Sequence, residues 1–149
     1  MHLRAYCSND WTAVCEIYNL SKPDELLGVV STESILPLDA DCDMQALFRG
    51  SQILVAEVAR RIAGFGGSRG SFITWLFVHP AFRRQGVATA LVREMLGRLQ
   101  QPVTLNVMMS NAPARTLYER IGFKVEREFQ GNFQGNPCNV AKLRYETAA

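Results

Sequence analysis

The segment from Phe72 to Val78 most limits the fold that this chain can adopt. It reads FITWLFV, is almost continuously apolar and is rich in aromatic and β-branched residues. A strand of this composition is typical of a sheet covered on both faces, because a half-exposed strand would alternate polar and apolar residues. The sequence therefore predicts a mixed α/β fold with helices on both faces of a sheet.

The chain before this segment is expected to supply two helices and a hairpin. Side chains at residues 8–10 offer caps for a helix that starts at Trp11, and this helix is expected to end near Ser21 because Pro23 disfavours helix in the preceding residue. The other expected elements are an opening strand at 3–7, irregular chain at 22–40, a helix at 44–50, a hairpin of strands at 53–58 and 61–66, and a glycine-rich turn, GGSRG, at 66–70.

The chain after this segment is expected to alternate helices and strands. Apolar residues recur at helical spacing from Val87 to Leu99, and Gly122 is well placed to end a short helix with Pro113 in its first turn. The other expected elements are a strand at 103–109, a strand at 123–129, a loop at 129–138 with the tandem FQGN, and a strand at 139–145. This order predicts a mixed sheet of about six to seven strands flanked by about four helices.

The length of 149 residues suits one domain over 1–149, which buries roughly 70% of its unfolded surface. The N-terminus has neither a basic leader nor a long apolar run, so a cytoplasmic protein without a membrane segment is expected.

The four cysteines lack CxxC spacing and the two histidines complete no ligand set, so no metal is expected. A net charge of +2, with basic pairs not interleaved with aromatics, disfavours nucleic acid.

Acidic residues gather in the acidic segment, residues 23–43, which holds no Lys or Arg. A solvated loop and helix start would explain this clustering. The alternative is a surface that attracts a cationic substrate, and both interpretations stay open. The six acids are Asp24, Glu25, Glu33, Asp39, Asp41 and Asp43.

A small-residue loop precedes the helix at 87–99. Gly86 and Ala88 lack bulk where backbone amides must approach a ligand, and the unpaired N–H groups of a helix N-terminus favour a pyrophosphate. Arg83 and Arg84 add charge-assisted hydrogen bonds to the same anion. Other phosphate loops are disfavoured, because the chain lacks GKS or GKT and its glycines at 64–70 miss the GxGxxG spacing.

Two ordered motifs make the sequence similar to the GNAT superfamily of N-acetyltransferases. The first is RRQGVA at 83–88, which resembles the family's cofactor loop. The second is SNAPARTLYERIGF at 110–123, which resembles the family's Asn, short helix with Tyr, and GF. The motifs cover about a third of the chain.

The resemblance implies that acyl-CoA lies where the strand ending near Val78 and the strand ending near Ser110 splay apart. Backbone groups of the first strand would hold the pantetheine arm and polarise the thioester carbonyl. The cofactor-binding residues implied are Phe77, Val78, Arg83, Arg84, Gln85, Gly86, Val87, Ala88, Thr89, Asn111 and Tyr118.

The resemblance also implies a catalytic acid, Tyr118, which would protonate the departing thiolate. A phenol has a pKa of about 10 and a thiol of about 8.5, so this proton transfer needs only a modest change in the pKa of the phenol. Some family members place a general base five residues before the motif Asn, where this chain has Asn106, which cannot accept a proton. The other candidates are Glu25, Glu33 and, more weakly, His79; the acceptor-site residues expected are Glu25, Glu33 and Asn106.

The expected reaction moves the acetyl group of acetyl-CoA directly onto a primary amine, with no metal and no covalent enzyme intermediate. The acceptor is expected to be a small cationic amine or a peptide amine, walled by segments 22–43 and 129–138. Two alternatives stay open: a protein N-terminal or lysine acetyltransferase, and a non-catalytic acyl-CoA sensor. The oligomeric state is also open, a homodimer included.

Overall fold

Seven strands form one mixed sheet in the computed structural model, which describes residues 1–26, 31–133 and 135–147. The strand order is β1-β2-β3-β4-β5-β7-β6, with β4 and β5 parallel and the other neighbours antiparallel. This confirms the predicted sheet. The strands are β1 His2–Ala5, β2 Gln52–Val58, β3 Arg61–Arg69, β4 Phe72–Val78, β5 Val103–Met108, β6 Lys124–Phe133 and β7 Asn136–Tyr145.

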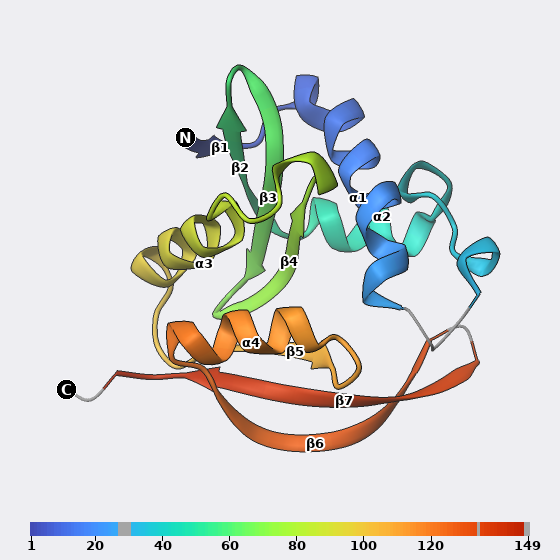
Figure 1. Ribbon diagram of the computed structural model, residues 1–149, viewed down its shortest axis with the longest axis vertical. Coiled ribbons are helices and arrows are strands. Elements are labelled where there is room, and N and C mark those ends of the chain that lie inside the picture. The colour runs from blue at the N-terminus through green and yellow to red at the C-terminus, as the bar shows by residue number, and fades with distance from the viewer. Residues whose placement is uncertain (27–30, 134, 148–149) are drawn as a thin grey trace.

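Helices cover both faces of the sheet, as expected (Figure 1). Helices α1 and α2 pack against one face and α3 and α4 against the other, each pair with its own buried cluster. Short 3-10 helices at 8–10, 32–34, 38–40 and 80–82 connect these elements. The four α-helices of the described residues are α1 Trp11–Glu25, α2 Cys42–Arg49, α3 Val87–Arg98 and α4 Ala112–Ile121.

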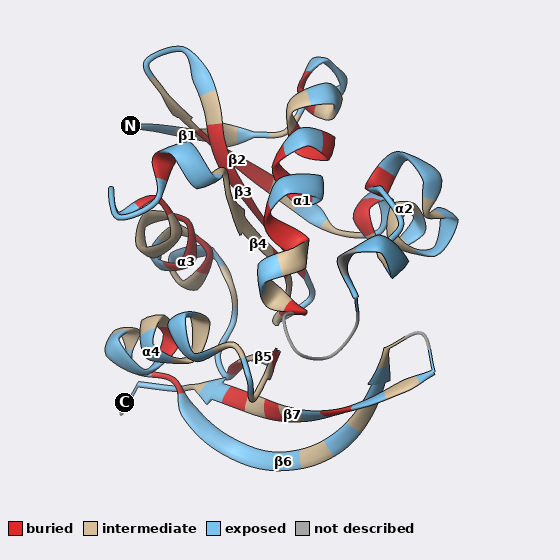
Figure 2. Ribbon diagram, turned by 45° about the vertical axis from the view of Figure 1, so that its right-hand side comes forward, coloured by how far each residue is buried: buried red, intermediate tan, exposed pale blue. Residues whose placement is uncertain are grey.

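Strand β4 contributes to both clusters, which confirms that it is covered on both faces (Figure 2). Its pairing with β3 shifts between Gly67 and Ser68: Gly67 pairs with Trp75 and Ser68 pairs with Ile73. Thr74 is therefore the extra residue on β4. Residues two apart share a face in a regular strand, and the extra residue of a bulge sends them to opposite faces. Ile73 therefore packs under α3, and Trp75 packs under α1.

The glycines at 66–67 lie inside β3, which corrects the expected turn. A Cβ at Gly66 would come within 2.8 Å of the Met95 methyl carbon, and one at Gly67 within 2.7 Å of Ile53. The strand therefore uses glycine because neighbouring side chains fill the space a Cβ would need. Only Gly70, with φ of +58°, lies in the turn.

Helix α1 continues through Pro23 to Glu25, so the predicted end near Ser21 is wrong. The proline removes one hydrogen bond from the last turn. Three side chains tie this turn down: the Ser21 hydroxyl donates to the carbonyl of Val78 at 2.9 Å, Lys22 pairs with Glu25, and Asp24 pairs with Arg83. Tertiary contacts thus override the local preference against helix.

The expected loop at 129–138 is mostly strand. β6 and β7 form a long hairpin, with Gln130 paired to Asn139 and Asn132 paired to Pro137. Gln, Asn and Gly favour strands weakly, but an antiparallel partner over the whole length supplies the missing stability. The tip of this hairpin lies near the C-terminal end of α1 (Figure 1).

Strands β4 and β5 separate almost at once. They pair only at Phe72 and Thr104, and the Thr104 N–H donates to the carbonyl of Ser71 at 3.0 Å. Beyond this position the two strands diverge toward their C-terminal ends. The sheet therefore opens in its middle, as the family resemblance implied.

Candidate functional site

A cleft fills the opening between β4 and β5; we call it the β4–β5 cleft. Its inner part, about 130 Å³, lies between the two strands, and an outer part of about 580 Å³ continues toward α1 and α4. The two parts share four lining residues: Glu25, Leu76, Phe77 and Asn111. Strands β4 and β5 and helices α1, α2 and α4 thus line one continuous site.

The outer cleft continues to the loop that precedes α3. A smaller hollow of about 210 Å³ lies there, and it shares Val78 and Arg83 with the outer cleft. We call this region, residues 83–89 with Val78, the cofactor end. Of the predicted cofactor residues, this hollow is lined by Val78, Arg83, Arg84, Gly86, Val87, Ala88 and Thr89.

The backbone at the cofactor end leaves helix donors open. Arg84 and Gly86 have φ of +63° and +78°, and no side chain of the described residues caps α3 at Gly86. The first helical bond runs from the Ala90 N–H to the carbonyl of Gly86 at 3.0 Å. The N–H groups before Ala90 therefore have no helical partner and suit an anion.

Three predicted cofactor residues have side chains that are buried, paired or outside these hollows. The Val87 side chain is buried in the cluster under α3, so only its backbone can meet a ligand. The Arg83 guanidinium lies 2.6 Å from the Asp24 carboxylate in an exposed pair. Gln85 is exposed and lines none of these hollows.

Strand β4 presents backbone groups to the cleft. The Val78 carbonyl accepts from Ser21, whereas the N–H of His79 donates to Ala63 on β3. In a strand the N–H and C=O of one residue point to the same edge, and those of the next residue point to the other edge. His79 points its N–H toward β3, so the N–H of Val78 points toward the cleft. Phe77 pairs with Phe65 of β3 and offers the cleft its ring.

Tyr118 lies in α4 against the inner cleft, beside Asn111 and Ala114. Its ring packs edge-on against Phe123, with ring centroids 5.5 Å apart. Burial raises the pKa of the Tyr118 hydroxyl, and the charge of Glu25 adds to the rise. The hydroxyl stays protonated at neutral pH, and nothing in the described residues accepts its hydrogen bond.

Asn111 and Asn106 line the same inner cleft but have different surroundings. The Asn111 side chain accepts from the N–H of Ala114 at 3.4 Å and so caps α4. Asn106 is exposed on β5, opposite Lys142 of β7. Both predicted positions therefore lie at the cleft.

The opposite end of the cleft carries an ion pair inside a set of rings; we call it the acceptor end. The ammonium of Lys22 lies 3.2 Å from the Glu25 carboxylate. Ring centroids of Tyr18, Phe77 and Phe133 lie 5.7, 5.8 and 5.7 Å from the same ammonium. Helix α1, strand β4 and the tip of β6 therefore meet around one charge.

Of the three candidate bases, Glu25 lies at the cleft. Glu25 lines both parts of the cleft. Glu33 is exposed in a 3-10 helix and lines none of the hollows. His79 is engaged elsewhere, because its Nδ1 accepts from the N–H of Ala81 and its Nε2 lies 3.5 Å from Glu16.

Three residues of the acceptor end escaped the sequence reasoning: Tyr18, Lys22 and Phe133. Lys22 and Glu25 are three residues apart, a spacing that places them side by side on a helix. That signal is hidden when the helix is taken to end before Pro23. Phe133 gives no local signal, because it contacts a residue of α1 that lies 111 positions away in the sequence.

The predicted acceptor walls are partly described. Residues 22–26 and 31–43 of the first wall are described, and the expectation for 27–30 lies outside the described residues, as it does for Gln134 in the second wall. Three of the six acids have partners: Asp24 with Arg83, Glu25 with Lys22, and Asp41 with the N–H of Met44. The pairs with Arg83 and Lys22 neutralise part of the acidic segment, and the hydrogen bond of Asp41 caps α2.

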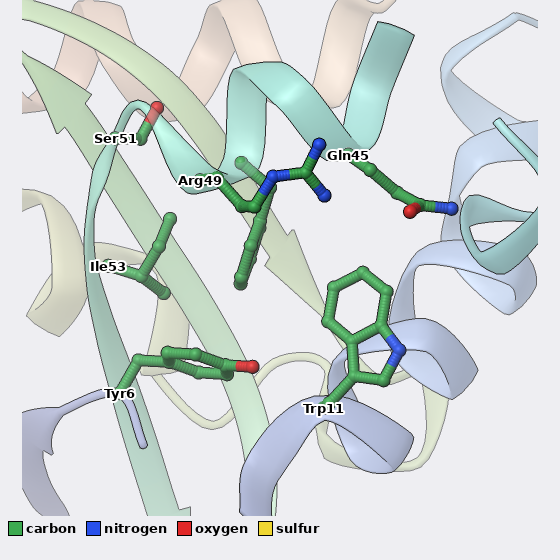
Figure 3. Close-up of a pocket in the computed structure, with 7 residues that line it drawn as sticks. Tyr6, Trp11, Gln45, Arg49, Ser51 and Ile53 are labelled. Atoms are coloured by element: carbon green, nitrogen blue, oxygen red, sulfur yellow. The ribbon is translucent and has the colours of Figure 1, made fainter. Parts of the chain in front are cut away.

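A separate hollow of about 770 Å³ lies between α1, α2 and β2 and shares no lining residue with the cleft (Figure 3). Figure 3 shows Tyr6 and Trp11 entering it from different segments, with Arg49 near its edge. The rings of Tyr6 and Trp11 both pack edge-on against Phe48. This hollow is thus floored by the aromatic core under α2.

Within residues 1–26, 31–133 and 135–147, no group of His, Cys, Asp and Glu could hold a metal ion. In the same part of the chain, no helix has the length and apolar character needed to cross a membrane.

Comparisons with known proteins agree with this architecture. The family model of the acetyltransferase (GNAT) domain matches residues 49–125. The human protein named cysteine-rich protein 2-binding protein is 44% identical over 57 residues, which cover 38% of this chain and 7% of the human protein. The chain therefore corresponds to a small part of that relative.

Solved structures resemble the whole described fold. A GCN5-related N-acetyltransferase from Rhodopseudomonas palustris has a TM-score of 0.80 at 18% identity, covering 98% of this chain and 95% of that one. The yncA protein of Salmonella typhimurium, solved with its cofactor acetyl-CoA, has a TM-score of 0.72 at 19% identity, covering 100% and 96%. At this identity the likeness concerns the fold.

Proposed function

This chain belongs to the acetyltransferase (GNAT) family, and from that premise we propose that it transfers the acetyl group of acetyl-CoA directly to a primary amine. One observation carries the proposal: open helix donors, a free strand edge and a buried tyrosine line connected parts of a single cleft. Each suits a different part of an acyl-CoA.

The cofactor end would hold the pyrophosphate. The open N–H groups of Val87, Ala88 and Thr89 and the guanidinium of Arg84 offer donors and positive charge to an anion. Gly86 leaves space, since a Cβ there would meet nothing within 4 Å. The yncA protein, which has a similar fold, was solved with acetyl-CoA, and this supports acetyl-CoA as the ligand that we propose.

The edge of β4 would hold the pantetheine arm and the thioester. The N–H of Val78 points toward the cleft and would polarise the thioester carbonyl as negative charge develops there. Phe77 would contact the arm through its ring, because its backbone groups pair with β3.

Glu25 is the base that we favour at the acceptor end. The amine nitrogen would attack the carbonyl carbon and form the new C–N bond, while its proton passes to Glu25 directly or through water. The C–S bond then breaks and leaves a thiolate. A positioned base contributes about 10² to 10⁴ in rate, and correct positioning of two reactants corresponds to effective molarities of roughly 10⁵ to 10⁸ M.

Tyr118 would supply the proton to sulfur. Proton donation would be easier with a lower pKa, whereas burial raises the pKa of Tyr118. We therefore infer that Tyr118 first donates a hydrogen bond to sulfur, and that the proton moves once negative charge has formed there.

Thiol release from acetyl-CoA tests the proposal. We would measure it with a panel of polyamines, amino acids, aminoglycosides and short peptides, beside a Tyr118→Phe variant. Release that depends on the acceptor and falls about 10² to 10⁴-fold in the variant would support the transferase. Turnover of peptides alone would favour the protein acetyltransferase alternative. Calorimetric binding of acetyl-CoA without any turnover would favour the sensor alternative and overturn the proposal.

A further inference from the structure

We propose that the acceptor is a free α-amino acid, whose carboxylate binds Lys22 while its amine lies against Glu25. This inference rests on the proposed function and names the substrate class of the same site. It departs from the cationic acceptor that the acidic segment suggested.

The ammonium of Lys22 has unused hydrogen-bonding capacity. Its side chain is only 8% exposed, and its hydrogen bond within the described residues goes to Glu25. An ammonium has three N–H donors, so two have no oxygen acceptor among the residues that the structure describes. A buried charge with unsatisfied donors is costly, and a ligand that accepts these bonds would be favoured.

The aromatic rings hold this ammonium in place without replacing such a ligand. Three ring faces within 6 Å attract the charge and restrict its movement. They offer no lone pairs comparable to those of a carboxylate. Lys22 is therefore a positioned cation that faces the inner cleft, where it is a lining residue.

The spacing of the ion pair fits one kind of acceptor. The ammonium of Lys22 and the carboxylate of Glu25 are 3.2 Å apart. An α-amino acid carries its amine and carboxylate on the same carbon, so opposite charges would alternate around the four groups. An acceptor with a second cation would instead meet the like charge of Lys22.

The other charges nearby support the same conclusion. Among the residues that line the inner cleft, Lys22 and Glu25 are the charged ones, and they balance each other. In the outer cleft Asp24 is paired with Arg83. The described cleft therefore presents balanced charges, which suit a zwitterion better than a polycation.

Matched acceptors test the inference. We would compare kcat/KM for free amino acids with kcat/KM for the corresponding amino acid amides, which keep the amine and side chain but lack the carboxylate. Hydrogen bonds to charged groups are strong enough to predict a preference of about tenfold to hundredfold for the acid. Equal rates for acid and amide would overturn the inference and leave the proposed transferase intact.

Variants of Lys22 complete the test. Lys22→Met, which keeps the length and loses the charge, is expected to abolish the preference, and Lys22→Arg is expected to keep most of it. An equal fall for acid and amide in Lys22→Met would instead indicate a role in the chemical step and contradict the inference. Circular dichroism checks that both variants fold.

A binding measurement separates the two proposals. We would titrate amino acids into the protein saturated with CoA and follow heat. Binding that is lost in Lys22→Met supports the carboxylate site even if no acetyl transfer occurs. No binding and no turnover of amino acids, with turnover of other amines, would overturn the inference alone.

Discussion

The two ends of the β4–β5 cleft are built in different ways. At the cofactor end the groups that we propose for the ligand are mainly backbone N–H groups of one short segment, with the guanidinium of Arg84 beside them, and Gly86 leaves open space. At the acceptor end they are side chains of α1, β4 and β6, brought together by the fold. The first end suits a constant ligand, and the second can change its ligand through single substitutions.

This difference predicts how each end responds to mutation. A change at the cofactor end should alter affinity for acetyl-CoA and leave the choice of acceptor unchanged. A change at the acceptor end should do the reverse. The following substitutions test this separation, from the largest expected effect to the smallest.

Glu25→Gln is expected to lower kcat by about 10² to 10⁴-fold at neutral pH, because the amide cannot accept the amine proton. Affinity for acetyl-CoA should change little. The measurement is the pH profile of kcat/KM, which should keep rising in the variant up to the pKa of the acceptor amine. Unchanged activity at neutral pH would mean that another group, or solvent, removes the proton.

Gly86→Asp is expected to weaken acetyl-CoA binding by about a hundredfold, because a carboxylate would face the pyrophosphate. Gly86→Asn is the matched control, since Asn and Asp both tolerate a positive φ and only Asp adds charge. Calorimetry with acetyl-CoA measures the difference. The two variants should bind acetyl-pantetheine equally, and a shared loss for that ligand would reveal distortion of the loop.

Phe133→Ala removes one ring from the set around Lys22. A buried cation–π contact predicts that KM for the acceptor rises about threefold to tenfold, with affinity for acetyl-CoA unchanged. Phe129→Ala is a control on the same strand, since Phe129 contacts Arg127 instead. Equal effects of the two changes would assign them to the hairpin's stability.

Asp24→Asn is expected to have the smallest effect. Its exposed pair with Arg83 competes with the cofactor for the guanidinium, so affinity for acetyl-CoA should rise about twofold to fivefold at low salt. The gain should disappear in about 0.5 M salt, where exposed charges are screened. A loss of affinity would indicate that the pair orders the loop.

The same contrast explains which parts of the site the sequence could predict. The loop at 83–89 is a local structure, so its glycine, its arginines and the following helix identify it in the sequence. Tyr118 and Asn111 are likewise part of one short motif. Lys22 and Phe133 lie 111 positions apart and meet only because a hairpin crosses under the end of α1. No pattern within either segment records that contact.

In the fold, too, local features could be predicted from the sequence and features that depend on distant contacts could not. The continuous apolar run of β4 predicted coverage on both faces, and the two clusters confirm it. The predicted helix end at Ser21 and the predicted turn at 66–70 were wrong because distant groups decide them. Val78 and Arg83 hold the last turn of α1, and the side chains of Met95, Ile53 and Trp75 lie where a Cβ of residues 66–67 in β3 would be.

The single pairing between Phe72 and Thr104 also bears on how the domain opens. Because β4 and β5 share one residue pair, strands β1 to β4 should separate locally from β5, β7 and β6 at low free-energy cost. Amide hydrogens along β5 should therefore exchange with solvent faster than those of β3. A pantetheine arm bound along β4 would bridge the gap. Acetyl-CoA should therefore slow this exchange and raise the melting temperature together, which makes the cleft a site of ligand-dependent cohesion between the halves of the protein.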